Sequence, residues 1–281
     1  MFYLLNILIQ MKILLNNKAL LKSLRPFNDL GFVPTMGGIH KGHLSLINKS
    51  KKLCKKTIVS IFINPKQFNN KKDLKFYPRN IKKDLEILKK SKKVDFVYLP
   101  KFKDIYKDNK RSKIILNKKD KILCAKFRNG HFEGVLDVMN RLTKIINPNK
   151  IFMGEKDFQQ LYLVKNFLEK RYKTKIIPCK TIRDKNKIAL SSRNILLNNC
   201  NLSTAGKIYK KLASIKRVIN NQKNVLNFLI NQKKKIELNF SVNIDYLELR
   251  NKKNLRYSKI TNNSKLFIAY YLNNVRLIDN I

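Results

Sequence analysis

Residues 31–43 read GFVPTMGGIHKGH, a short apolar run that leads into a glycine pair and then two histidines. The apolar run ending at Val33 predicts a strand. After the glycines, Leu44, Ile47 and Leu53 recur near helical spacing. A buried strand that turns sharply into a helix indicates the start of a parallel α/β sheet.

The same alternation of short apolar runs and helical patterns continues along the chain. Further strands are expected at 57–63, 94–98, 150–153 and 175–177, and helices at 44–55 and 157–172. After Cys179 the chain becomes polar, then Lys- and Asn-rich and helical, and then shows strand patterns at 241–249 and 265–272. We therefore predict an α/β fold with a Rossmann-like doubly wound parallel sheet and a second, smaller α+β domain.

The charge of the chain raises the question of a nucleic-acid partner. The 281 residues carry a formal net charge of +44, and lysine-rich surfaces gain affinity by releasing counterions from phosphates. The lysines are spread along the chain beside abundant Asn and Ile, and runs such as 233–235 are typical of a solvated surface. We expect no nucleic-acid partner, although a charge-driven binding protein that has lost catalysis stays an alternative.

The cysteines and the N-terminal stretch point to a cytoplasmic chain. Cys54, Cys124, Cys179 and Cys200 lie far apart, with no C-x-x-C pair and no histidine at metal-ligand spacing. The start, MFYLLNILIQMKILL, is apolar but is interrupted by polar residues and lacks a small-residue cleavage site. We interpret it as a non-functional extension that leads into a first strand, and we expect no membrane partner.

Polar motifs follow the predicted strands at 35–43, 64–68 and 154–160. Ligands of open parallel sheets bind at these strand ends. Gly37 and Gly38 permit a sharp turn in which phosphate could approach the backbone amides, and His40 and His43 would share a face at the start of the following helix. Two imidazole donors could then stabilise a triphosphate. The alternative is that one histidine caps the helix and the other packs.

Seven ordered motifs carry a resemblance to a known family. They read VPTMGGIHKGHLSLI, VSIFINPKQF, DLKFYPRN, GHFEGVLDV, FMGEKDFQQL, ALSSRN and VRLIDNI. Together they closely resemble the pantoate–beta-alanine ligase (pantothenate synthetase) family, in the HIGH-motif nucleotidyltransferase superfamily. The resemblance runs from about Gly31 to Ile281. A nucleotidyltransferase of this superfamily with another acceptor stays open, because H-x-G-H reports only the nucleotide half.

The resemblance implies a two-step reaction without a covalent enzyme intermediate. ATP and pantoate would give pantoyl adenylate and pyrophosphate, and beta-alanine would then displace AMP to form pantothenate. It also implies residues 1–179 as a Rossmann-like domain for ATP and pantoate, and 180–281 as a smaller C-terminal α+β lid. Mg²⁺ is expected with ATP, held mostly by phosphate oxygens. The family further implies a homodimer.

The resemblance also assigns site residues by motif position. The implied ATP-binding residues are Met36, Gly37, Gly38, Ile39, His40, Lys41, Gly42, His43, Gly154, Glu155, Lys156, Asp157, Ile182, Leu190, Ser191, Ser192 and Arg193. The implied catalytic residues are His43, His40, Lys156 and Arg193, with His43 treated by the family as an acid. From the chemistry alone, both histidines need only stabilise phosphate charge.

Gln67 and Gln160 match the glutamines that hold pantoate, and Asn64 and Tyr77 are further substrate-binding candidates. The glutamines could instead lie on the surface at loop ends, and Tyr77 could simply pack. Asp84 could be an outer Mg²⁺ ligand, although a helix-surface acid is the preferred interpretation. The chain departs from the family pattern at Lys41, Gly38, Phe158 and Asn80, and none of these changes removes a group that the mechanism needs.

Overall fold

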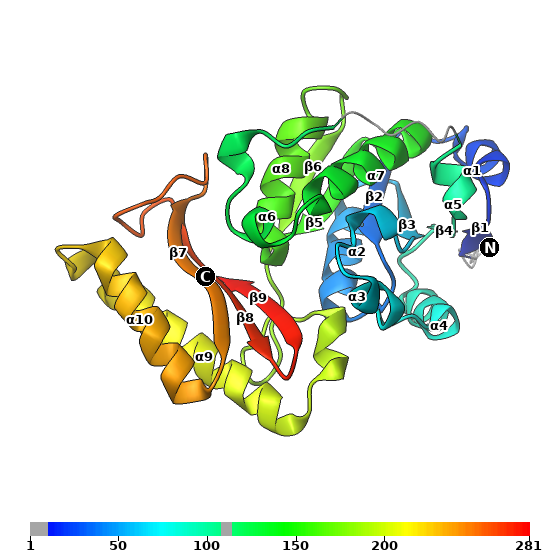
Figure 1. Cartoon of the computed structure of the whole chain (residues 1–281). Helices are drawn as coiled ribbons and strands as arrows, with labels where there is room; N and C mark the ends of the chain where they lie inside the picture. The colour runs from blue at the N-terminus through cyan, green and yellow to red at the C-terminus, as the bar shows by residue number, and fades with distance from the viewer. Residues whose placement is uncertain (1–10, 108–113) are drawn as a thin grey trace, which may run out of the picture.

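The chain folds around two separate sheets, each with its own helices (Figure 1). The computed structural model describes residues 11–107 and 114–281. Most of the apolar N-terminal stretch, residues 1–10, lies outside the described residues. The predicted first strand is β1 (Lys12–Leu14), which lies at the end of that stretch.

The larger sheet is parallel throughout and has the strand order β1-β4-β3-β2-β5-β6. Its other strands are β2 (Leu30–Thr35), β3 (Lys56–Ile61), β4 (Phe96–Tyr98), β5 (Lys150–Gly154) and β6 (Lys175–Cys179). The predicted doubly wound sheet is confirmed. Strand order reverses between β2 and β5, and in open α/β sheets ligands bind at such a point, beyond the carboxyl ends of the strands.

Helices cover both faces of this sheet (Figure 1). One face packs against α1 (Asn17–Leu24), α7 (His131–Ile146) and α8 (Phe158–Leu168). The other face packs against α2 (Lys41–Leu53) and α4 (Ile81–Ser91). Strands buried on both faces need continuous apolar sequence, which is why these runs were recognisable.

Short helical segments fill the connections of this part of the chain. They are η1 (Pro65–Gln67), α3 (Lys71–Lys75), α5 (Phe102–Ile105), η2 (Lys118–Asp120), α6 (Cys124–Phe127) and η3 (Glu155–Asp157). Two of them carry predicted site residues: η1, which comes after β3, and η3, which comes after β5.

The smaller sheet is antiparallel and has the order β7-β8-β9. Its strands are β7 (Asn243–Asn251), β8 (Ser264–Leu272) and β9 (Val275–Asn280), and its helices are η4 (Ser192–Leu196), α9 (Asn199–Val218), η5 (Ile219–Asn221) and α10 (Val225–Phe240). Asn273 and Asn274 both have positive φ, as a two-residue hairpin turn of this hand requires. That turn produces the third strand, which hydrophobic alternation did not indicate.

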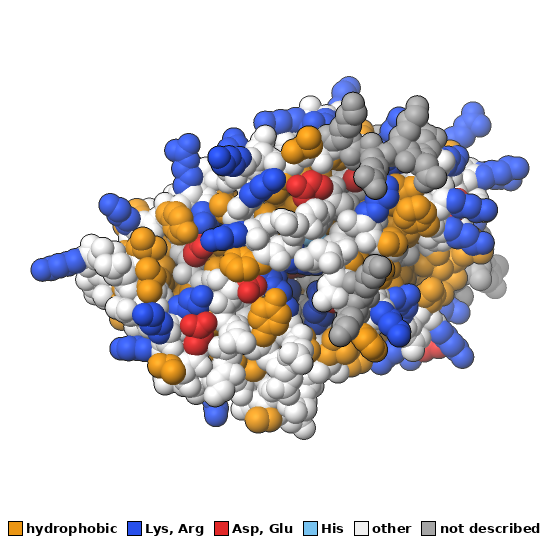
Figure 2. Space-filling view, in the orientation of Figure 1, with side chains coloured by type: hydrophobic (Ala, Val, Ile, Leu, Met, Phe, Trp, Pro, Cys, Tyr) orange, Lys and Arg blue, Asp and Glu red, His pale blue; other side chains and the backbone are white. Residues whose placement is uncertain are grey.

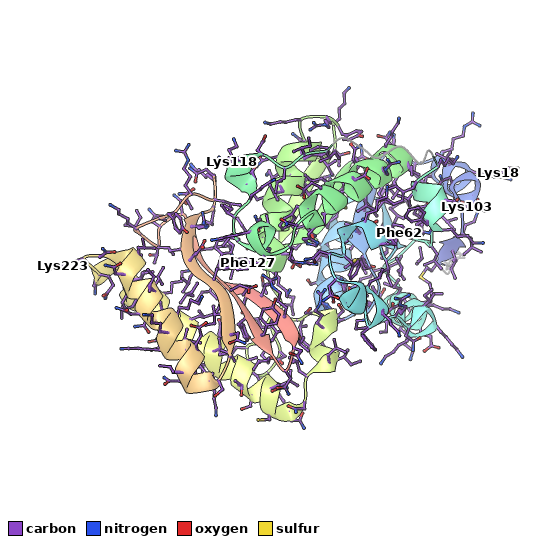
Figure 3. The ribbon with its side chains drawn as sticks, in the orientation of Figure 1. Lys18, Phe62, Lys103, Lys118, Phe127 and Lys223 are labelled. Atoms are coloured by element: carbon purple, nitrogen blue, oxygen red, sulfur yellow. The ribbon has the colours of Figure 1, made fainter. Side chains whose placement is uncertain are left out.

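The two sheets are joined by apolar contacts as well as by the chain. Tyr246, Phe267 and Ala269 of the smaller sheet belong to the same core cluster as α7 and α8. Phe127 of α6 lies against Tyr246, with ring centroids 6.0 Å apart. In Figure 3 the labelled Phe127 lies between α6 and this sheet, whereas Phe62 lies inside the larger unit. The interface is therefore partly a shared core.

The fold predicts that Gly134 of α7 cannot gain a side chain. A Cβ there would lie 2.3 Å from the backbone oxygen of Lys66, because the helix is pressed against η1. We expect Gly134→Ala to lower the free energy of unfolding by about 1–3 kcal/mol in urea titrations. At Gly154 a Cβ would meet nothing within 4 Å, so Gly154→Ala is the control and should stay within about 0.5 kcal/mol. Equal stability of the two variants would contradict this packing.

Candidate active site

A cavity of about 250 Å³ lies at the carboxyl ends of β2, β3, β5 and β6. Its walls come from the turns after these strands, from α7 and from the segment 180–193 that leads to the smaller sheet. The cavity therefore occupies the position that strand order predicts. All three histidines of the chain line it.

The turn after β2 is held by Asp84, an acid that was expected on a helix surface. Asp84 of α4 is only 3% exposed, and its two oxygens accept the backbone N–H groups of Gly38 at 2.9 Å and Ile39 at 2.7 Å. Asp84 is therefore not a helix-surface acid, and that interpretation is wrong. The expectation that phosphate approaches the glycine amides is also wrong, because the Gly38 N–H donates to Asp84 and the Gly37 N–H donates to Thr35 Oγ1 at 3.2 Å.

The glycine pair serves the shape of this turn. Gly37 and Gly38 have φ of +84° and +62°, a region that favours glycine. A Cβ on Gly37 would lie 2.9 Å from Asp84 Oδ2, and one on Gly38 would lie 2.8 Å from Ser192 Cβ. Glycine thus lets the carboxylate approach from one side and the 191–193 segment from the other.

His40 and His43 bind the open N-terminus of α2 through their Nδ1 atoms. His40 Nδ1 accepts the backbone N–H of Gly42 at 3.0 Å, and His43 Nδ1 accepts that of His40 at 3.4 Å. A neutral imidazole that accepts at one nitrogen carries its proton on the other. Both rings therefore present Nε2–H as a donor. Both histidines cap the helix, and both also line the cavity. Capping was expected of only one of them, as an alternative to a role in the site.

The histidines are strongly biased toward the neutral form. Burial, followed by the charge of Lys156, lowers the pKa of His40 to about 4. Burial, followed by the neighbouring His40, lowers the pKa of His43 to about 3. At neutral pH both rings are therefore uncharged, and each carries a single ring proton, on Nε2. They are suited to donate hydrogen bonds rather than to release protons.

The turn after β3 places Gln67 at the cavity wall. Its Nε2 lies 2.9 Å from the sulfur of Met36, and it is 7% exposed. Asn64, at 1% exposure, lies behind it: Asn64 Nδ2 donates to Gly134 O at 3.1 Å and to Gln67 Oε1 at 3.4 Å. Tyr106 in turn donates to Asn64 Oδ1 at 2.9 Å. Asn64 therefore supports Gln67 and does not line the cavity.

Arg128 and His131 line the cavity but were not predicted as site residues. His131 Nδ1 lies 2.7 Å from the backbone oxygen of Gln67, so this nitrogen carries the proton, and Arg128 donates to Nε2 at 3.0 Å. Burial, then the charge of Arg128, lowers the pKa of His131 to about 3. The available signal was the GHFEGVLDV motif, which carried the resemblance without a residue assignment.

The turn after β5 contributes a charged pair. Lys156 Nζ lies 3.5 Å from Asp157 Oδ1. Burial works to raise the pKa of the Asp157 carboxyl, but the charge and hydrogen bond of Lys156, followed by Arg193 and His131, hold it below its ordinary value. Asp157 is therefore an anion at neutral pH. Glu155 points elsewhere and pairs with Lys265 at 3.5 Å.

The segment 191–193 closes the cavity from the side of the smaller sheet. Tyr77 and Ser192 share a hydrogen bond of 3.0 Å between their hydroxyls. Arg193 pairs with Asp73 at 2.9 Å, and its guanidinium lies 5.6 Å from the centre of the Tyr77 ring. Tyr77 is 6% exposed, so it both packs and faces the cavity.

The structure brings most predicted site residues to one place. Those that line the cavity are Met36, His40, Gly42, His43, Gln67, Tyr77, Gly154, Lys156, Asp157, Gln160, Ile182, Leu190, Ser191, Ser192 and Arg193. Those that do not are Gly37, Gly38, Ile39, Lys41, Asn64 and Glu155. Ile39 packs in the core, and Lys41 is exposed at the start of α2. The interpretation of the two glutamines as surface residues is not supported.

Positive charge is dispersed over the face of the molecule shown in Figure 2. Lys and Arg side chains lie scattered over the visible face instead of gathering over one element (Figure 2).

Within residues 11–107 and 114–281, none of the helices combines the length and the hydrophobicity that a membrane span requires. The same residues contain no cluster of three or more His, Cys, Asp or Glu placed to hold a metal ion.

Comparison with known sequences gives one family. The sequence model of the family described as pantoate-beta-alanine ligase matches residues 11–281. A pantothenate synthetase of Flavobacterium psychrophilum is 38% identical over 268 residues, which cover 92% of this chain and 94% of that protein. One of Francisella tularensis subsp. mediasiatica is 39% identical, covering 89% of this chain and 88% of that protein.

Solved structures agree. The pantothenate synthetase of Thermus thermophilus superposes with a TM-score of 0.89 at 27% identity, over 96% of this chain and 99% of that chain. The pantoate-beta-alanine ligase of Francisella tularensis, complexed with beta-gamma ATP and beta-alanine, gives a TM-score of 0.81 at 37% identity over 96% and 97% of the chains. The chain therefore belongs to the pantoate–beta-alanine ligase family, and it is an acid–amine ligase of pantothenate biosynthesis.

Proposed function

We propose that the chain joins pantoate to beta-alanine in two steps within this cavity. A carboxylate oxygen of pantoate attacks the α-phosphorus of ATP, and the bond to the leaving pyrophosphate breaks. The beta-alanine amine then attacks the acyl carbon of pantoyl adenylate, gives up a proton to solvent, and AMP leaves. The observation that carries the proposal is the meeting of two imidazoles, a lysine, an arginine and two glutamine amides in one cavity.

The two helix-capping histidines suit the first step. Their Nε2–H groups are donors held in place by the backbone of α2, and negative charge builds up on phosphate oxygens as pyrophosphate departs. Their low pKa values support a charge-stabilising role over proton transfer. This favours the chemical interpretation over the family's description of His43 as an acid.

Lys156 and Arg193 supply positive charge to the same phosphate chain. Lys156 extends from the turn after β5, and Arg193 from the segment that follows β6. Ser191 and Ser192 add hydroxyls beside Arg193, a combination suited to the outer phosphates. We propose that Mg²⁺ arrives with ATP and is held mainly by phosphate oxygens. Asp84 is not proposed as its ligand, because both of its oxygens already accept backbone N–H groups.

Gln67 and Gln160 suit the acid substrate. An amide can donate to a carboxylate or hydroxyl and accept from a hydroxyl without repelling the anionic nucleophile. The Francisella relative crystallised with beta-gamma ATP and beta-alanine supports both ligand classes for this chain. The segment 180–193 forms one wall, which supports residues 180–281 as a lid that shields the adenylate from water and 1–179 as the ATP- and pantoate-binding domain.

We further propose a cytoplasmic homodimer. The four cysteines are free thiols, as expected in a reducing compartment. The dimer follows from the family resemblance and is tested by the mass of the purified protein in light scattering.

The first test separates this reaction from that of a nucleotidyltransferase with another acceptor. With ATP and pantoate alone, we expect a burst of pyrophosphate close to one equivalent per enzyme, because the adenylate stays bound. Adding beta-alanine should start steady turnover with equal amounts of AMP and pantothenate. Pyrophosphate release that does not need pantoate would favour the other acceptor and overturn the proposal.

The second test separates the histidines from the glutamines. His43→Ala should slow adenylate formation in rapid-quench single turnovers by roughly a hundredfold, because one preorganised donor is lost. Its affinity for pantoate should stay unchanged. Gln160→Ala should instead weaken pantoate binding by about tenfold, as expected for a lost hydrogen bond to a charged group, and should regain most of the rate at saturating pantoate.

Lys52→Ala is the matched control for this pair, because Lys52 is exposed on α2 and far along the helix from its histidine-bearing end. Lys52→Ala should leave both the single-turnover rate of adenylate formation and the affinity for pantoate unchanged. A His43→Ala enzyme with the wild-type single-turnover rate would remove His43 from the mechanism. Wild-type pantoate dependence in Gln160→Ala would remove Gln160 from the pantoate site.

A further inference from the structure

The turn that carries Lys156 has no side-chain cap, and its own side chains contribute only the pair between Lys156 and Asp157 at 3.5 Å. The η3 turn, Glu155–Asp157, has no side-chain hydrogen bond at its N-cap, and α8 begins after it with no side-chain cap either. Gly154 has open space where a Cβ would be, so no neighbouring atom packs there. Further restraint on the backbone of this turn has to come from elsewhere.

It comes from β9 of the smaller sheet. Asn280 Nδ2 donates to the backbone oxygen of Glu155 at 2.9 Å and to that of Lys156 at 2.8 Å. Asn280 is only 3% exposed, and its neighbours on the strand are paired with β8, including both backbone hydrogen bonds between Ile281 and Leu266. A rigid, buried amide therefore holds two consecutive carbonyls of the turn.

The preceding residue, Asp279, holds the hairpin that leads to the segment 190–193. Both oxygens of Asp279 accept from the guanidinium of Arg183, at 2.6 and 2.9 Å, and Arg183 also donates to Asn280 O at 3.2 Å. Arg183 forms a β-bridge with Ala189, and Leu190 donates its N–H to Ile182 O at 2.9 Å. The Arg183 end of this hairpin thus fixes the start of the segment 190–193.

We propose that Asn280 and Asp279 are positioning residues for the ATP site. Through Asn280 the strand sets the Lys156 turn, through Asp279 it sets the hairpin that leads to Arg193, and the two cationic segments consequently approach the phosphate chain as one unit. This inference rests on the proposed function, since it takes Lys156 and Arg193 to bind the phosphates. Neither Asn280 nor Asp279 lines the main cavity, so both act through the segments that they hold.

The test measures binding of a non-hydrolysable ATP analogue by calorimetry. Asn280→Asp keeps the shape of the side chain but turns an oxygen toward the two carbonyls, and Asn280→Ala removes the group. Both should weaken the analogue by roughly tenfold, which is the loss of one to two net hydrogen bonds, while pantoate affinity stays unchanged. Amide hydrogen exchange across 154–158 should become faster. Wild-type analogue affinity in Asn280→Asp would overturn the proposal.

A double-mutant cycle separates positioning from general destabilisation. If Asn280 acts through Lys156, then adding Asn280→Ala to the Lys156→Ala variant should weaken binding of the ATP analogue by less than about a further threefold. A full further tenfold loss would contradict the proposal. Glu248→Gln is the matched control, because it removes an ion pair with Arg250 in the same sheet and outside the cavity. An equal loss of affinity in this control would mean that the sheet matters only for stability.

Asp279→Asn provides an independent variant in case Asn280→Ala does not fold, as judged by its thermal transition. It should weaken the analogue by a similar factor and speed hydrogen exchange across 183–193 instead of 154–158. Unchanged exchange in both segments would overturn the proposal. Because binding and exchange are measured without turnover, failure of the pyrophosphate assay would reject the proposed reaction without deciding this inference.

Discussion

The site depends on two hydrogen bonds at the N-terminus of α2, where backbone amides of Gly42 and His40 donate to the Nδ1 atoms of His40 and His43. These bonds use helix amides that would otherwise lack partners, and they fix both the tautomer and the direction of each ring. Burial and Lys156 then keep the rings neutral. Protonation would place an N–H against an N–H, so the same geometry that orients the donors also opposes their charging.

Each reacting segment is held from behind by a buried polar group. Asp84 holds the turn after β2, Asn64 and His131 hold the turn after β3, and Asn280 holds the turn after β5. Asp84, His131 and Asn280 satisfy backbone atoms that strand ends leave without ladder partners, and Asn64 holds the side chain of Gln67. The supporting layer lets short turns present side chains with little freedom, as electrostatic stabilisation of a transition state requires.

The sequence predicted the sheet because strands buried on both faces are continuous apolar runs, and their positions hold within about two residues. Helix α7 was not predicted. Strand β9 was not predicted either, because it depends on a hairpin turn at Asn273 and Asn274. Most of the residues that the family resemblance assigned to the site do line the cavity, but it left other wall residues such as Arg128 and His131 without a role. Asp84 and Asn280 could not be placed, because they act on backbone atoms 46 and 125 residues away along the chain. Such pairings depend on tertiary structure, which local patterns do not report.

The central claim is that His40 and His43 act as neutral Nε2–H donors. Nitrogen NMR of protein labelled at the histidine rings, followed from about pH 8 to about pH 5, tests it most directly. With pKa values of about 4 and about 3, both rings should stay in the neutral Nε2–H form over this range, because they protonate only as the pH falls toward those values. For His40 or His43, a titration midpoint near the ordinary histidine value of about 6.5, or a proton on Nδ1, would contradict the account.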